Sequence, residues 1–174
     1  ISKSGKASYA LNLDSYPNIR NCQLLIPAVC DCNAIIAIDD DETVLANYVD
    51  IALEELGGYH HNRQIDGKTG FYYHEWGDFL VKEPEGVLYE KNLFRRKEFF
   101  INNTFRQLQS AEERFVTTPI ALGGNMVFSK ALFNHVPFDP QVTRGEDIDY
   151  LINSRCLGYH WFFDKNLRID HFPP

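Results

Sequence analysis

The pattern of apolar and polar positions predicts an α/β domain. Residues 33–38 form a continuous apolar run that ends in acidic residues, which is typical of a buried strand. Residues 42–56 carry apolar side chains at helical spacing, and Gly57 and Gly58 follow them as a stop signal. A strand, an acidic turn and a helix in this order indicate one strand–helix unit of an α/β fold.

The remaining pattern alternates between short strands and helices. Residues 23–29 predict a short edge strand or strand end, because Pro27 cannot donate to a β-ladder. We expect further strands within 59–76, 120–129, 159–163 and 167–172, and helices over 90–109, 130–135 and 146–157. The helix over 90–109 is expected to be broken near Asn102 and Asn103.

Composition and charge narrow the class of protein. The 174 residues are enough for one domain with a core, and a hydrophobic content of 44% indicates a globular chain. The net charge of −7 argues against nucleic acid as a partner, since nucleic-acid binding usually needs a broad basic surface. No apolar segment reaches the roughly 18 residues of a membrane-spanning helix, so we expect a cytoplasmic protein. Any membrane association would come through sequence outside this chain.

Four cysteines occur in the sequence. They are Cys22, Cys30, Cys32 and Cys156. A single Cys-x-Cys spacing without a second pair is a poor zinc pattern. We therefore expect reduced, mostly buried thiols.

The strongest candidate for chemistry is the acidic stretch Asp39, Asp40, Asp41 and Glu42, which follows the predicted strand. Ligands of open α/β sheets bind outside the carboxyl ends of strands. Crowded carboxylates repel one another, and a bound Mg²⁺ or Mn²⁺ would relieve this repulsion and accept phosphate as a further ligand. The alternative is an acidic first helical turn with Asp41 as the N-cap, stabilised by the helix dipole. This stretch alone does not separate the two hypotheses.

Two further groups could bind a metal with each other. His60-His61 and His74-Glu75 carry suitable side chains, but their spacing lacks the helical His-Glu-x-x-His pattern of zinc enzymes. Histidines without a metal are the alternative.

Five segments occur in an order that resembles a known family. They are "GKASYALN" (5–12), "IDDDE" (38–42), "LGGNMVFS" (122–129), "RGEDIDYLINSRCLGY" (144–159) and the late His171. This order resembles the GT-A class of nucleotide-sugar-dependent glycosyltransferases, especially the family 2-like group. The resemblance covers roughly 1–57 and 119–174, and 59–118 is then expected to be an acceptor-side insert within the domain.

The resemblance implies a fold and the absence of one of its regions, the N-terminal nucleotide-binding strands. The implied fold is a GT-A-like mixed sheet flanked by helices, of the α/β class. The family has a nucleotide-binding region before its Gly-Lys segment, whereas only Ile1 to Ser4 precede Gly5 here. We therefore expect a partial domain over 1–174 that lacks the N-terminal nucleotide-binding strands and pairs its open sheet edge with missing sequence or with a second copy.

The resemblance also assigns a metal site and a donor site. Asp39, Asp41 and His171 would bind Mn²⁺ or Mg²⁺, with Asp41 as the more direct ligand and Asp40 as the variable middle residue. The nucleotide-sugar donor would contact Lys6, Asn12, Asp39, Asp40, Asp41, Gly123, Gly124 and Asn125. The alternatives are a surface lysine at Lys6, a structural His171 and a β-bulge at the two glycines.

The implied catalytic residues open the helix over 146–157. Asp147 would be the general base that deprotonates the acceptor hydroxyl, and Glu146 would hold the acceptor. Acidic residues in a first helical turn need no function, which is the alternative. Aromatic side chains near these segments could stack on a sugar ring or belong to the core: Tyr72, Tyr73, Trp76 and Trp161.

The expected function is sugar transfer from a nucleotide-diphosphate donor to a hydroxyl of a carbohydrate, lipid or other acceptor, with inversion of the anomeric centre. Retaining transfer also remains open, because retaining members carry acidic residues near the same place. A nucleotidyltransferase-like enzyme and a non-catalytic domain that binds carbohydrate or a partner are the alternatives.

Overall fold

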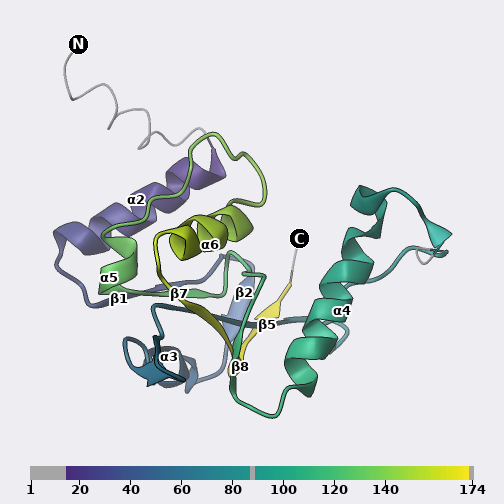
Figure 1. Cartoon of the computed structure of the whole chain (residues 1–174), viewed down its shortest axis with the longest axis horizontal. Coiled ribbons are helices and arrows are strands. Elements are labelled where there is room, and N and C mark those ends of the chain that lie inside the picture. The colour runs from purple at the N-terminus through teal and green to yellow at the C-terminus, as the bar shows by residue number, and fades with distance from the viewer. Residues whose placement is uncertain (1–14, 87–88, 173–174) are drawn as a thin grey trace.

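The computed structural model describes residues 15–86 and 89–172. These residues form a mixed α/β structure in which helices flank one large sheet (Figure 1). The strands are β1 Ala34–Ala37, β2 Glu42–Val44, β3 Tyr59–His60, β4 Arg63–Gln64, β5 Gly67–His74, β6 Phe115–Thr117, β7 Met126–Ser129 and β8 Trp161–His171. The helices are α2 Tyr16–Val29, α3 Tyr48–Leu53, the 3-10 helix η2 Leu93–Arg96, α4 Lys97–Ser110, α5 Lys130–Phe133 and α6 Glu146–Cys156.

The large sheet is mixed in direction. Its strands follow the order β1-β7-β5-β8-β2, and β6 pairs with β8 beside β2. Only the β5–β8 pair is parallel, whereas β1–β7, β5–β7, β2–β8 and β6–β8 are antiparallel. Strand β8 contacts three other strands along its length and is therefore the centre of the sheet.

Helices cover both faces of this sheet. Met126 and Phe128 of β7 pack in one core cluster with α2, α5 and α6, while the intervening Val127 packs in another with α3. Successive side chains of a strand point to opposite faces, so these helices lie on opposite sides, as Figure 1 shows. Helix α4 packs at the far end of the sheet, where Phe105 and Leu108 meet Phe71 and Phe163.

Trp161 is the largest side chain of the core, and its position requires glycine at residue 67. It is fully buried, and its indole N–H donates to the Oγ of Ser154 at 2.8 Å. A Cβ at Gly67 would lie 2.6 Å from the indole ring. Only glycine therefore lets β5 and β8 approach each other here.

The predicted strand over 23–29 is wrong, because this segment belongs to helix α2. The buried face of α2 includes Asn18, Arg20, Asn21 and Leu24, so it is largely polar and invisible to a hydrophobic pattern. The Asn21 side chain exchanges two hydrogen bonds with the backbone of Phe138, at 2.9 and 2.8 Å. These long-range bonds satisfy the Asn21 side chain on this polar helix face.

The predicted helix over 42–56 is wrong in its first part. Glu42–Val44 is strand β2, which pairs with the end of β8, and α3 covers only Tyr48–Leu53. The acidic residues therefore do not cap a helix, and that alternative for the acidic stretch is excluded. The strand predicted over 33–38 is confirmed as β1, but it lies at the sheet edge and Ile38 beyond it is 39% exposed.

Other predicted elements are confirmed with changed limits. The two strands expected over 159–163 and 167–172 are one continuous strand, β8. Helix α4 runs without a break through Asn102, whose buried side chain bonds both backbone groups of Val81 and the carboxylate of Glu83. Within 59–118, β5 belongs to the sheet itself, whereas α4 lies beside it (Figure 1).

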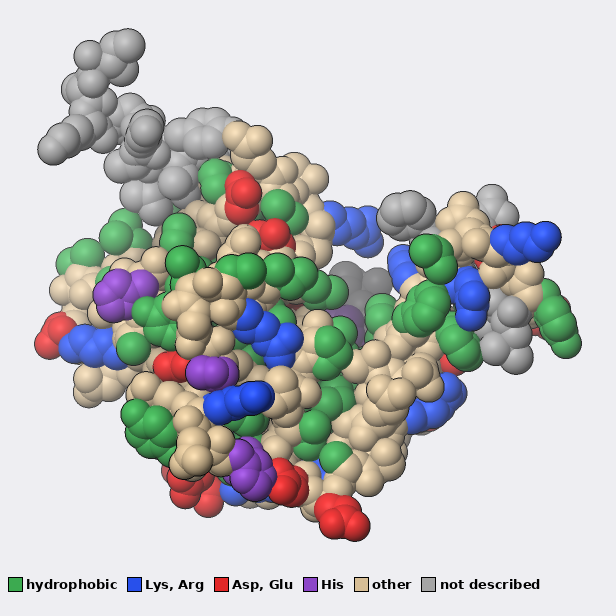
Figure 2. All heavy atoms as spheres, viewed as in Figure 1, with side chains coloured by type: hydrophobic (Ala, Val, Ile, Leu, Met, Phe, Trp, Pro, Cys, Tyr) green, Lys and Arg blue, Asp and Glu red, His purple; other side chains and the backbone are tan. Residues whose placement is uncertain are grey.

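Three further observations concern the surface charges, the helices and the cysteines. On the face in view in Figure 2, Lys and Arg side chains are interspersed with acidic and neutral ones. Within the described ranges, no helix combines the length and apolar character needed to cross a bilayer. All four cysteines lie in these ranges, and none of them forms a disulfide there. Cys30 and Cys156 are exposed and Cys22 and Cys32 only half-buried, so the expectation of mostly buried thiols is wrong.

A buried ion network ties the sheet to α3. The Nζ of Lys68 lies 3.1 Å from Asp164 Oδ2, and both side chains are out of contact with solvent. Nζ also donates to the carbonyls of Ile51 and Glu54, at 2.7 and 2.9 Å. Burial lowers the pKa of Lys68, and Asp164 opposes that effect. Arg114 completes the network with two hydrogen bonds to Asp164, at 2.8 and 2.9 Å.

We predict that Asp164→Ala lowers the free energy of unfolding by about 3 kcal/mol or more, because it leaves a buried lysine without its counter-charge. Urea unfolding followed by circular dichroism measures this loss. Asp170→Ala, on the same strand, is the matched control because the Asp170–Arg168 pair is partly exposed. The control should cost no more than about 1 kcal/mol, and equal losses for the two variants would contradict the prediction.

Candidate functional site

Several segments that are distant in the sequence meet at one edge of the large sheet. The register places Ala37 beside Met126 and His171 beside both Glu42 and His74. The carboxyl ends of β1, β5 and β8 therefore lie at the same edge as the amino ends of β7 and β2. We call this region the acidic edge and define it by Arg20, Asp39, Asp41, Glu42, Tyr72, Gly123, Gly124, Asp147 and His171.

Asp41 and His171 form a direct pair at the acidic edge. The Nε2 of His171 lies 3.2 Å from Asp41 Oδ2, and both side chains are partly exposed. The backbone supports the pair, since Phe172 N–H donates to the Asp41 carbonyl at 2.9 Å. The other ring nitrogen of His171, Nδ1, is buried and makes no hydrogen bond within the described residues.

Asp39 has a different partner, Arg20. The guanidinium of Arg20 lies 3.0 Å from Asp39 Oδ1 and 3.2 Å from Oδ2, and the Arg20 side chain is only 11% exposed. Together, Asp39, Asp41 and His171 do not bring three ligand atoms within 4.8 Å of one another. Of the three expected metal ligands, Asp41 and His171 therefore lie together, whereas Asp39 forms an ion pair with Arg20.

Glu42 occupies the middle of the acidic edge. Its Oε2 accepts a hydrogen bond from Asp39 N–H at 2.8 Å, while its buried Oε1 has no hydrogen-bond partner among the described residues. Burial raises the pKa of this carboxyl. The Tyr72 hydroxyl faces it and accepts a hydrogen bond from Gly124 N–H.

Gly124 makes this arrangement possible. A Cβ at this position would lie 2.0 Å from Glu42 Oε1. The group that closely approaches the backbone at Gly124 is therefore the Glu42 carboxylate. A larger residue would push that carboxylate away.

Asp147 faces the same turn from the start of α6. Burial raises the pKa of the Asp147 carboxyl, and the neighbouring charge of Glu146 adds to this effect. A Cβ at Gly123 would lie 2.7 Å from an Arg20 nitrogen and 4.0 Å from Asp147 Oδ2. Gly123 therefore lets Arg20 and Asp147 approach the same point, and the half-buried Glu146 lies one residue away.

The other expected site residues have different surroundings. Asn125 is fully buried and accepts a hydrogen bond from the Tyr48 hydroxyl at 2.8 Å, so it has a structural environment. Asp40 is exposed. Lys6 and Asn12 lie outside the described residues.

The four aromatic residues considered for stacking on a sugar ring have different surroundings. Trp161 is core, which excludes it from stacking on a ligand. Tyr72 lies beside His171, with ring centroids 5.4 Å apart. Trp76 is 44% exposed and stacks on His74 at 4.3 Å. Tyr73 is covered by the guanidinium of Arg168, 3.6 Å from the ring centroid.

The sequence did not single out two of these residues. Arg20 lies in the first half of α2, before the segment 23–29 that was predicted as a strand, and no local signal marks it. Glu42 was part of the acidic stretch, yet only the pairing of β2 with β8 shows that it points into the site. Both side chains lie at the acidic edge because of tertiary contacts.

Asp41 and His171 offer two adjacent candidate metal ligands at this edge. Neither Asp39 nor Glu42 brings a third ligand atom within 4.8 Å of both. Mg²⁺ and similar ions are commonly bound by one or two carboxylates together with substrate phosphates. Two adjacent protein ligands are therefore sufficient for such an ion when a diphosphate supplies further oxygens.

Comparisons with known proteins show the fold alone. No protein-family model and no curated protein matches the chain. Among solved structures, the crystal structure of A197 from STIV is similar, with a TM-score of 0.54 and 13% sequence identity. The match covers 91% of this chain and 68% of that chain.

We predict that Glu42→Gln raises the free energy of unfolding at pH 7 by about 1 kcal/mol. Because burial raises the pKa of Glu42 above its ordinary value of 4.5, the folded state keeps this proton where the unfolded chain has lost it. Stability contributed by the protonated carboxyl is therefore lost as pH rises from about 4.5 through the raised pKa. Glutamine removes this loss and keeps an oxygen for the Asp39 N–H.

Urea unfolding at pH 4 and at pH 7 measures the effect. The stabilisation should be present at pH 7 and nearly absent at pH 4. Glu112→Gln, at an exposed carboxylate, is the matched control and should change stability little at either pH. Destabilisation by Glu42→Gln at pH 7 would contradict the prediction.

Proposed function

We propose that this chain carries the catalytic part of a metal-dependent glycosyltransferase that moves a sugar from a nucleotide-diphosphate donor to a hydroxyl acceptor. The observation that carries the proposal is the convergence of Asp39, Asp41, Asp147 and His171 at one sheet edge. These residues come from the separate motifs whose order resembles the GT-A class. A structural set of surface acids would have no reason to converge with a glycine turn.

The observed sheet is compatible with the fold of such a glycosyltransferase. We propose that the mixed sheet flanked by helices is a GT-A-like sheet, with β1 as the strand that leads to the Asp-x-Asp motif. The likeness to A197 supports the α/β architecture only. The assignment to GT-A therefore rests on the motifs and their meeting at the acidic edge.

The donor diphosphate would bind beside Asp41 and His171, which would hold Mn²⁺ or Mg²⁺. Such a cation stabilises the negative charge that develops on a leaving diphosphate. Arg20, paired with Asp39 and largely buried, adds a fixed positive charge at the same edge. Gly123 lets the Arg20 guanidinium approach the backbone of this turn, and Gly124 lets the Glu42 carboxylate do so.

The acceptor would approach from the side of α6. Burial raises the pKa of Asp147, and a carboxylate with a raised pKa takes a proton more readily than an exposed one. Asp147 would remove the hydroxyl proton as that oxygen attacks the anomeric carbon. Glu146, one residue earlier, would hold the acceptor. Trp76 is exposed near this edge, but His74 stacks on its ring and Lys82 Nζ lies 4.4 Å from its centroid.

We predict that one nucleotide-sugar raises the melting temperature of the full chain in the presence of Mn²⁺. A ligand that binds only the folded state stabilises it by about 2.7 kcal/mol at 100 times its Kd. Asp41→Asn should abolish the Mn²⁺-dependent shift, because it removes a ligand charge. Asp147→Asn should keep the shift but lose sugar transfer, because it removes the base and leaves the donor site intact. A panel of UDP-, GDP-, ADP- and CDP-sugars measures this.

Asp50→Asn, at an exposed position on α3, is the control and should change neither the shift nor transfer. A nucleotide-dependent shift without turnover, even with a full acceptor panel, would favour a non-catalytic binding domain. Release of pyrophosphate from a nucleoside triphosphate and a sugar phosphate would favour a nucleotidyltransferase. A chain that shows no shift with any nucleotide would contradict a donor site at the acidic edge.

A further inference from the structure

The β3–β4 hairpin brings two adjacent histidines to one side of the chain. Tyr59 pairs with Gln64 and His60 with Arg63, so His61 and Asn62 form a two-residue turn. Both turn residues have positive φ angles, 47° and 61°, as a type I′ turn requires. In a regular strand, neighbouring side chains point to opposite faces, but here the two imidazole rings lie 4.2 Å apart.

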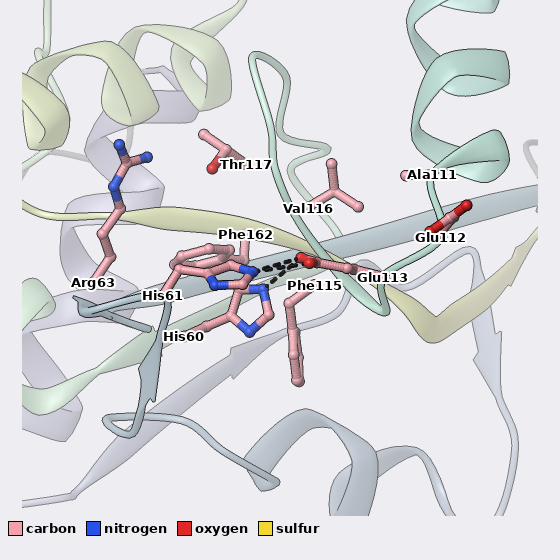
Figure 3. Close-up of a pocket in the computed structure, with 10 residues that line it drawn as sticks. All are labelled: His60, His61, Arg63, Ala111, Glu112, Glu113, Phe115, Val116, Thr117 and Phe162. Carbon is pink, nitrogen blue, oxygen red and sulfur yellow. Dashed lines mark hydrogen bonds and ion pairs between the residues drawn. The ribbon is translucent and has the colours of Figure 1, made fainter.

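Glu113 faces both rings from the loop between α4 and β6 (Figure 3). One carboxylate oxygen lies 2.9 Å from His60 Nε2, and the other lies 2.9 Å from His61 Nε2. One ligand atom from each residue lies within 4.8 Å of the others. Among the described residues, no other set of three or more His, Cys, Asp or Glu side chains meets this criterion.

The packing behind these residues holds them in place. The His60 ring contacts the edges of Phe115 and Phe162, with centroids 5.7 and 5.6 Å away. The residue after Glu113 is Arg114, which is held by two hydrogen bonds to the buried Asp164. The Glu113 loop is therefore anchored one residue from its carboxylate. Such support keeps ligands preorganised before a metal arrives.

We propose that His60, His61 and Glu113 form a binding site for a divalent transition metal, with Zn²⁺ as the preferred class. Two imidazole nitrogens and one carboxylate are a common zinc ligand set, and three protein ligands leave a fourth position for water or substrate. That position opens into a pocket of about 570 Å³, lined also by Arg63, Thr117 and Val116 (Figure 3). Zn²⁺ would be bound by the two imidazoles in their neutral form and would replace their present hydrogen bonds to Glu113.

This site differs from the acidic edge in place and in chemistry. It lies at the amino end of β5, whereas His74 lies at the carboxyl end of that strand, beside Trp76 and His171. The less favoured hypothesis that His60-His61 and His74-Glu75 share one metal site is therefore wrong, and Glu113 is the residue that lies beside the two histidines. Imidazole-rich sites favour Zn²⁺ over Mg²⁺, whereas oxygen-rich sites favour Mg²⁺ and Mn²⁺.

Calorimetric titration of the full chain with Zn²⁺, together with the visible absorption of bound Co²⁺, tests the proposal. His61→Asn and Glu113→Gln should each weaken binding by at least about tenfold and reduce the Co²⁺ absorption. Both residues are exposed, so these changes should leave folding intact, and asparagine tolerates the positive φ at position 61. His135→Asn and Glu85→Gln are matched controls at exposed positions outside this pocket and should not affect binding.

Asp41→Asn separates this site from the acidic edge. Zn²⁺ binding that survives Asp41→Asn but not His61→Asn supports the inference, whatever the outcome of the nucleotide-sugar panel. Binding that is lost in Asp41→Asn and unchanged in His61→Asn overturns it, because the ion would then lie at the acidic edge. The absence of Zn²⁺ binding by the unaltered chain at neutral pH also overturns it.

Discussion

Asp164 lies within β8, out of contact with water, and its carboxylate binds the Nζ of Lys68 and the guanidinium of Arg114. Through these partners it ties β8 to β5, to the loop before β6 and, via the Glu54 carbonyl, to the end of α3. A buried ion pair adds little net stability compared with an apolar pair, but breaking it leaves a charge without a partner. The network therefore penalises any other register of β5 against β8.

Both candidate sites depend on that register. With β5 and β8 fixed in parallel, His74 and His171 come together at one end, next to Asp41 and the buried carboxylate of Glu42. At the other end, the anchored Arg114 positions the loop that presents Glu113 to the hairpin histidines. The first site offers mainly oxygen donors and the second mainly imidazole nitrogens, so the two are suited to different cations.

Local patterns were sufficient for much of the fold. The apolar run 33–38, the helix-forming stretch 97–110 and the helix start at Glu146 follow from propensity and spacing. Helix α2 escaped prediction because its buried face is largely polar, and one of its residues, Asn21, bonds the distant backbone of Phe138. Strand β2 escaped because its structure depends on the free edge of β8, which no local pattern contains.

The sequence by itself determined which residue types could do chemistry: an acidic stretch after a strand, a glycine pair, an acidic helix start and a late histidine. Their order was also sufficient to propose a family. Only the tertiary structure decided which of them meet, because sheet pairing and helix packing join positions more than a hundred residues apart. In the folded chain Asp39 pairs with Arg20, the Glu42 carboxylate packs against Gly124, and Asn125 is buried. Glu113 contacts two histidines because a hairpin turn brings both imidazole rings to the same side, which linear spacing does not reveal.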